Sequence, residues 1–137
     1  MNFDLTEDHV MMRKMVRDFA EAEVQPGAEE RDEHEEFPAE LWKKCGQLGL
    51  AGITFPEEYG GGGLDQISYG LIMQELERGD SGIRSTASVQ SSLVMYPIYT
   101  YGSEEQRKKF LPKLASGEWL GCFGLTEPDH GSNPSGM

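Results

Sequence analysis

The clearest helical pattern in the chain lies in residues 69–96, which read YGLIMQELERGDSGIRSTASVQSSLVMY. Apolar residues recur in its first half at the spacing of one helix face: Tyr69, Ile72, Met73 and Leu76. This spacing leaves Glu75, Glu77 and Arg78 to face water or a cleft. The glycine-containing stretch 79–82 then ends the helix.

The second half of this stretch predicts another helix, from Ile83 to about Tyr96, with an unusual surface. One face is small and polar and carries a single cation: Arg84, Ser88, Ser91 and Ser92. The apolar side consists of Val89, Leu93 and Tyr96. Taken alone, Arg84 is a surface residue that pairs with Asp80 or Glu77.

Three more helices are predicted around this pair, starting at residues that favour helix beginnings: Thr6, Pro38 and Ser103. Ser103 and Gln106 have the spacing of a capping box. The expected buried stripes are Met12, Met15, Val16 and Phe19 in the first helix, Leu41, Cys45 and Leu48 in the second, and Phe110, Leu111 and Leu114 in the third. The chain is therefore predicted to be mainly α.

The pattern changes after Gly117, where residues 119–125 alternate with period two and predict a strand with two largely apolar faces. No second strand of similar strength exists in the sequence, and one strand cannot satisfy its own backbone groups. We therefore expect the chain to be the front part of a longer protein, with a helical domain at 1–117 and the truncated start of a β domain at 118–137.

The composition excludes several classes of protein. Twelve Lys and Arg against 24 Asp and Glu give a net charge of −12, the wrong sign for binding nucleic acid. No apolar run approaches the ~20 residues of a membrane span. Cys45 and Cys122 form no CxxC pair, and the histidines lack metal-ligand spacing, so neither a disulfide framework nor a metal site is predicted.

Three further segments carry no catalytic or binding prediction. The acidic stretch 21–40 is interpreted as a solvated surface. The run of glycines at 60–63 lacks the lysine of a phosphate-binding loop. Residues 1–10 have no export signal, which indicates a cytoplasmic protein.

Residues 122–132, CFGLTEPDHGS, resemble the flavin-binding signature of the acyl-CoA dehydrogenase family. Residues 55–61, 101–103 and 111–115 resemble the helical domain of the same family. The resemblance implies that the chain is the family's N-terminal helical-bundle domain plus the first strand of the following β domain, with FAD as cofactor. It places Phe123, Gly124, Leu125 and Thr126 at the flavin, and Ser132 near both the FAD pyrophosphate and the substrate. Asp129, His130 and Asn133 depart from the usual signature, and His130 is interpreted as a loop histidine.

Within the family, residues 75–85 and 88–95 are most similar to glutaryl-CoA dehydrogenases. The glutaryl group ends in a second carboxylate, which needs a cation and hydrogen-bond donors when it leaves water. The resemblance assigns this role to Arg84, assisted by Ser85, Ser88 and Glu77. The alternative remains an Arg84 that forms only a surface ion pair.

The function implied by the resemblance is the FAD-dependent oxidation of the α,β bond of glutaryl-CoA, with decarboxylation to crotonyl-CoA. This reaction belongs to lysine and tryptophan degradation. The expected partners are the acyl-CoA substrate, electron-transferring flavoprotein and further copies of the chain in a homotetramer.

No catalytic residue is predicted in this chain, because the family's glutamate base lies in its C-terminal domain. The chain alone is expected to be inactive, whether it is a fragment, one piece of a split enzyme or a truncated product. Two other functions remain: a short-chain acyl-CoA dehydrogenase, and a helical interaction module without catalysis.

Overall fold

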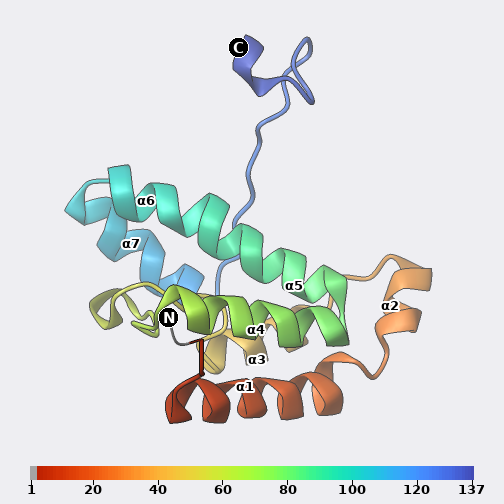
Figure 1. Cartoon of the computed structure of the whole chain (residues 1–137). Helices are drawn as coiled ribbons and strands as arrows, with labels where there is room; N and C mark the ends of the chain where they lie inside the picture. Colours follow the sequence, from red (N-terminus) through yellow and green to blue (C-terminus); the bar gives the residue numbers. More distant parts are fainter. Residues whose placement is uncertain (1–2) are drawn as a thin grey trace.

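The computed structural model describes residues 3–137 and is mainly helical, as the sequence predicts. The helices are α1 (Glu7–Phe19), α2 (Ala28–His34), α3 (Ala39–Gln47), α4 (Gln66–Gly79), α5 (Ser81–Ser88), α6 (Tyr96–Tyr101) and α7 (Glu104–Ala115). Two π-helical segments continue them: η1 (Ala20–Val24) extends α1, and η3 (Val89–Met95) joins α5 to α6. Short 3₁₀ turns are formed by η2 (Glu57–Tyr59) and η4 (Pro134–Gly136). Helix α1 packs on α4 and α4 packs on α5, while α7 lies against α6 (Figure 1).

Side-chain caps explain where the main helices begin. Thr6 and His9 form a capping box at the start of α1, and Ser103 and Gln106 form the predicted one at the start of α7. Asp65 caps α4 through the Ser68 amide, at 2.7 Å. Each cap satisfies backbone N–H groups that have no partner within the helix.

The apolar side chains form two clusters. One joins α1, α3, α4 and α5, and the other joins α7 and η3 to residues around Phe55. Cys45 lies in the first cluster, as predicted, and burial raises the pKa of its thiol to about 12. Leu48 was expected in the same stripe but is 42 % exposed, because α3 ends at Gln47 and the chain turns away from the helix at Gly49.

The apolar side predicted for the second helix of the 69–96 stretch is wrong. Leu93 and Tyr96 are exposed, while Gln90, Ser91 and Met95 are buried. The reason is η3: its wider π turns rotate the following side chains relative to an α-helical projection. This rotation brings a glutamine into the interior.

The strand predicted at 119–125 is not formed as a paired strand in the part of the chain that the structure describes. After α7 the segment leaves the helices as an extended trace (Figure 1), and β-type pairing among residues 3–137 is confined to one bridge between Glu127 and His130. The physical cause is that a lone strand has no neighbour with which to form ladder hydrogen bonds.

No helix within residues 3–137 combines the length and the apolar character needed to cross a bilayer.

Candidate functional site

The junction of α4 and α5 brings together three of the residues that the sequence assigned to substrate binding. Glu77 lies in the last turn of α4, and Arg84 and Ser88 lie one turn apart on α5. Arg84 Nε donates to Glu77 Oε2, and Arg84 Nη1 lies 3.4 Å from Ser88 Oγ. The Arg84 side chain is 34 % exposed. The contacts of Arg84 with Glu77 and Ser88 therefore link α4 and α5 at the surface.

Asp80, the other expected partner of Arg84, is engaged elsewhere. Its Oδ1 accepts from the Gly82 amide at 2.7 Å and so caps α5, while its Oδ2 accepts from Arg31 Nη2 at 2.7 Å. Arg31 also donates to the Pro26 carbonyl at 3.1 Å. This connection ties the segment before α2 to the start of α5, and Glu77 remains as the carboxylate that pairs with Arg84.

The protonation state of Glu77 follows from its neighbours. The Arg84 guanidinium, and then the Ser81 hydroxyl at 2.9 Å, hold the pKa of Glu77 below its ordinary value. Glu77 is therefore a carboxylate at neutral pH that orients Arg84, and it is a poor general base.

The two serines contribute differently. Ser88 Oγ donates to the Ser85 carbonyl at 2.9 Å, so its proton is used within the helix and its oxygen is left as an acceptor for Arg84. Ser85 enters this group through its backbone. The arrangement orients Arg84 and leaves the N–H groups of Nη2 for a ligand, since the contacts that the structure describes use Nε and Nη1.

A groove of about 730 Å³ lies beside this site between α2 and the α4–α5 junction. Six acids and one arginine line it: Glu29, Asp32, Glu35, Glu36, Glu77, Asp80 and Arg31. Arg84 is not part of this lining. The groove is thus lined mainly by acidic side chains, and Glu77 belongs to both the groove and the Arg84 group.

The predicted cofactor residues do not belong to the helices of the Arg84 group but to the segment that leaves the helices after α7 (Figure 1). Phe123 is 49 % exposed and Leu125 is 40 % exposed, and Thr126 and Ser132 are also exposed. A Cβ placed on Gly124 would meet nothing within 4 Å. Extended backbone, exposed apolar side chains and an open glycine fit the edge of a flat aromatic ring system such as a flavin.

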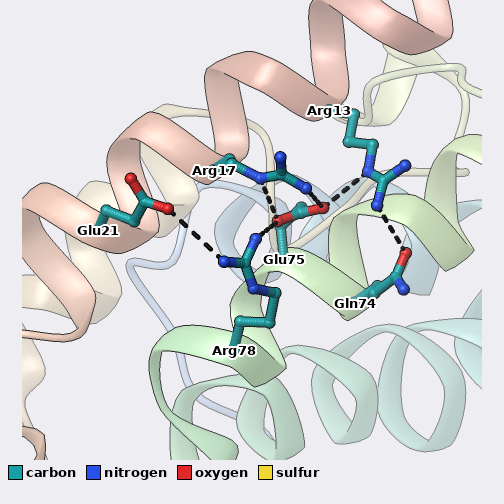
Figure 2. A network of polar contacts seen from close by, with 6 residues as sticks. All are labelled: Arg13, Arg17, Glu21, Gln74, Glu75 and Arg78. Carbon is teal, nitrogen blue, oxygen red and sulfur yellow. Dashed lines mark hydrogen bonds and ion pairs between the residues drawn. The ribbon is translucent and has the colours of Figure 1, made fainter.

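Glu75 is the most buried carboxylate described, with 1 % of its side chain exposed, whereas the helical pattern indicated a residue that faces water or a cleft. Its Oε1 accepts from Arg13 Nε and Arg17 Nη2, both at 2.7 Å, and its Oε2 accepts from Arg17 Nε at 2.9 Å and Arg78 Nη1 at 3.1 Å. Figure 2 shows the three guanidinium groups around this carboxylate. The hydrogen bond from Arg17 is the main cause that lowers the pKa of Glu75 to about 2, against the effect of burial. Glu75 is therefore a structural link between α1 and α4 and cannot serve as a base.

We expect Glu75→Gln to remove a pH-dependent part of the stability. Folding lowers the pKa of Glu75 from 4.5 to about 2, so its contribution is complete above pH 4.5 and is lost as the pH falls toward 2. At pH 7 the variant should lose about 2 kcal/mol of unfolding free energy, less than for a fully buried pair because the guanidinium groups are partly hydrated. Urea unfolding of the 137-residue chain between pH 7 and pH 2.5 measures this.

A suitable control is Glu40→Gln, because Glu40 is 84 % exposed and, within residues 3–137, its ion pair is with the neighbouring Lys43. It should change stability by less than about 0.5 kcal/mol at every pH. A gap between Glu75→Gln and the unmodified chain that stays constant down to pH 2.5 would contradict the network.

Sequence reasoning missed Gln90. This residue is fully buried, and its carboxamide bonds to the backbone at Leu114, Trp119 and Gly121. The signal available in the sequence was a long amide side chain directly beside the predicted polar face of the 83–96 helix.

Comparison with known proteins identifies the family. Residues 6–118 match the model of the acyl-CoA dehydrogenase N-terminal domain. A probable acyl-CoA dehydrogenase of Bacillus subtilis, YngJ, is 51 % identical over 99 % of this chain and 36 % of its own length. A glutaryl-CoA dehydrogenase of Mycobacterium smegmatis in complex with FADH2 is 50 % identical, with a TM-score of 0.92 over 97 % of this chain and 34 % of that one. Butyryl-CoA dehydrogenase of Megasphaera elsdenii is 40 % identical, with a TM-score of 0.89 over 99 % of this chain and 36 % of that one.

The chain thus spans about a third of the length of the relatives it matches. These relatives include enzymes named for glutaryl-CoA and for butyryl-CoA, so the comparisons alone do not select one substrate. What they share is the helical domain described above. The chain belongs to the acyl-CoA dehydrogenase family, and its helices are that family's N-terminal domain.

Proposed function

We propose that this chain is the N-terminal part of an FAD-dependent glutaryl-CoA dehydrogenase that converts glutaryl-CoA to crotonyl-CoA and CO2. The observation that carries the proposal is the group formed by Arg84, Glu77 and Ser88 at the α4–α5 junction. It presents an oriented guanidinium at the junction of these two helices.

Electrostatics favours a substrate with a distal carboxylate. A carboxylate taken out of water needs charged or hydrogen-bonding partners, and a guanidinium supplies charged N–H donors. A plain acyl chain would need an apolar surface at the same place, where an arginine covered by the chain would lose its hydration. Because Glu77 pairs with Nε, Arg84 can keep its orientation while the Nη2 donors bind the ligand.

Residues of the C-terminal segment would hold the FAD. Phe123, Gly124, Leu125 and Thr126 would contact the flavin ring, and Ser132 would lie near the pyrophosphate and the thioester end of the substrate. When bound, FAD supplies the acceptor for the hydride that leaves the β-carbon. We propose that this segment, residues 118–137, begins the second domain of the longer protein.

The general base of the reaction would come from outside this chain. Glu75 and Glu77 both have lowered pKa values and are held by arginines, so neither is suited to remove an α-proton. The role of these 137 residues is to bind and orient, and the chain alone should not turn over substrate.

The proposed enzyme also has an electron acceptor, an oligomeric state and a metabolic role. Electron-transferring flavoprotein would accept the electrons, the longer protein would form a homotetramer, and the reaction would serve lysine and tryptophan degradation. A cytoplasmic location agrees with Cys45 and Cys122, which are both free thiols.

A second candidate is a short-chain acyl-CoA dehydrogenase. Arg84 already has Glu77 as a partner, and this ion pair would leave no net charge for a carboxylate to neutralise. The similarity to the butyryl-CoA enzyme supports the same alternative. No contact in the described residues favours a helical interaction module without catalysis.

The products decide between the two enzymes. The longer protein, given glutaryl-CoA and an electron acceptor, should release CO2 and crotonyl-CoA in equal amounts, measured by isotope-labelled CO2 and by chromatography. Oxidation of butyryl-CoA to crotonyl-CoA, with no CO2 from glutaryl-CoA, would instead establish the short-chain enzyme.

A further inference from the structure

Gln90 is fully buried in η3, and both ends of its carboxamide are bonded to backbone groups from later in the chain. Its Nε2 donates to the Leu114 carbonyl at 2.9 Å and to the Trp119 carbonyl at 2.8 Å, and its Oε1 accepts from the Gly121 amide at 2.8 Å. A buried amide that makes these three bonds is held in one orientation.

Two of the three bonds are made with residues 119 and 121 of the segment that leaves the helices. A residue on an adjacent parallel β-strand would bond the same two groups, the carbonyl of one residue and the amide two residues later. The Gln90 side chain therefore takes the place of a partner strand at the first position of the predicted strand. This explains how the backbone at residues 119–121 is held in place without a ladder.

Other contacts also hold the backbone at residues 119–121. The Trp119 amide donates to the Lys113 carbonyl at 3.0 Å. A Cβ on Gly121 would lie 2.4 Å from Cγ1 of Val94, so the backbone at Gly121 is pressed against η3. Two residues later the segment reaches Phe123, which is half exposed.

Register explains why this anchor matters for function. A slip by one residue would move Phe123 and Leu125 one position along the segment, together with the tight turn in which the Leu125 amide donates to the Phe123 carbonyl at 3.1 Å. A bond to the carbonyl at 119 together with one to the amide at 121 permits a single register. Gln90 also lies on the same continuous helix as Arg84, six residues further on.

We propose that Gln90 is a positioning residue, which fixes the register of the flavin-contacting residues 123–126 relative to the substrate-binding Arg84. The inference rests on the proposed function for the role of residues 123–126, whereas the anchor itself is a property of this chain. Gln90 touches neither cofactor nor substrate and acts through the backbone at 119–121.

Amide hydrogen exchange in the 137-residue chain tests the anchor without FAD. Gln90→Met keeps the length and shape of the side chain but removes its hydrogen bonds, and the Gly121 amide should exchange at least about tenfold faster. Gln90→Glu loses both N–H donors and places a buried carboxyl group against the Leu114 and Trp119 carbonyls, so it should lose at least as much of this protection. The control is Ile83→Ala, a buried change on the same helix in the other apolar cluster, which should leave Gly121 unchanged relative to the global stability.

FAD binding by the longer protein tests the consequence. Gln90→Met should weaken FAD binding by about tenfold and shift the flavin absorbance, Gln90→Glu should weaken it at least as much, and Ile83→Ala should do neither. Unchanged exchange at Gly121 in Gln90→Met would overturn the anchor, and equal FAD affinity in the two proteins would overturn the positioning role. If instead the unmodified longer protein bound no FAD, the proposed function would fail while the exchange result still decided the anchor.

Discussion

Replacing Gly46 by alanine is expected to destabilise the chain by about 3 kcal/mol or more, although alanine is the better helix former. Gly46 lies in α3 against the turn that follows α7. A Cβ there would lie 2.1 Å from the Ser116 carbonyl oxygen and 2.7 Å from the Gly117 nitrogen. These are backbone atoms, so no side chain can rotate to relieve the contact and the helix or the turn must move.

The consequence reaches the candidate site, because the turn at 116–117 leads directly into the segment held by Gln90. Gly117 itself has a φ of +74°, a left-handed conformation that suits glycine. We therefore expect Gly46→Ala also to increase amide exchange at Gly121.

Gly70 provides the matched control. It lies in α4, and a Cβ on it would meet nothing within 4 Å. Gly70→Ala should stabilise the chain by about 0.5–1 kcal/mol through helix propensity alone. Urea unfolding of both variants measures the contrast, and a Gly46→Ala chain as stable as Gly70→Ala would show that α3 does not pack on the 116–117 turn.

The second large effect is expected at Arg84, in the longer protein. Arg84→Gln should lower kcat/KM for glutaryl-CoA about 100-fold, because the distal carboxylate would be bound without a charged partner. Butyryl-CoA has no such carboxylate, and its kcat/KM should change less than about threefold. Arg84→Lys should recover part of the loss, since an ammonium restores the charge but not the planar, fixed donor geometry of the guanidinium.

Arg107→Gln is the matched control, because Arg107 is also a partly exposed arginine in an ion pair with a glutamate. It is 29 % exposed and pairs with Glu104 within α7, away from the α4–α5 junction. Arg107→Gln should leave the ratio of the two substrates unchanged. An equal loss on glutaryl-CoA and butyryl-CoA in Arg84→Gln would remove the argument for a distal carboxylate.

The local patterns of the sequence predict most of the fold. Thr6 and Ser103 mark helix starts because their caps depend on residues only three positions away, and Cys45 is placed correctly in the core. Leu93 was misplaced because an α-helical projection cannot represent the π segment that contains it.

The long-range polar contacts could not be predicted in the same way. Glu75 is buried because Arg13 and Arg17 approach it from about 60 positions earlier in the chain, at separations of 62 and 58 residues. The partners of Gln90 are backbone atoms 24 to 31 residues downstream, and backbone atoms leave no pattern in a sequence. Glu77 and Arg84 could be paired in advance since only one helix break separates them.

The most direct test of the account is the ratio of kcat/KM for glutaryl-CoA to that for butyryl-CoA, measured with the unmodified longer protein. A guanidinium that binds the distal carboxylate predicts a ratio of about 100 or higher. A ratio below one would contradict the account, because Arg84 would then be a surface ion pair of Glu77 with no part in choosing the substrate.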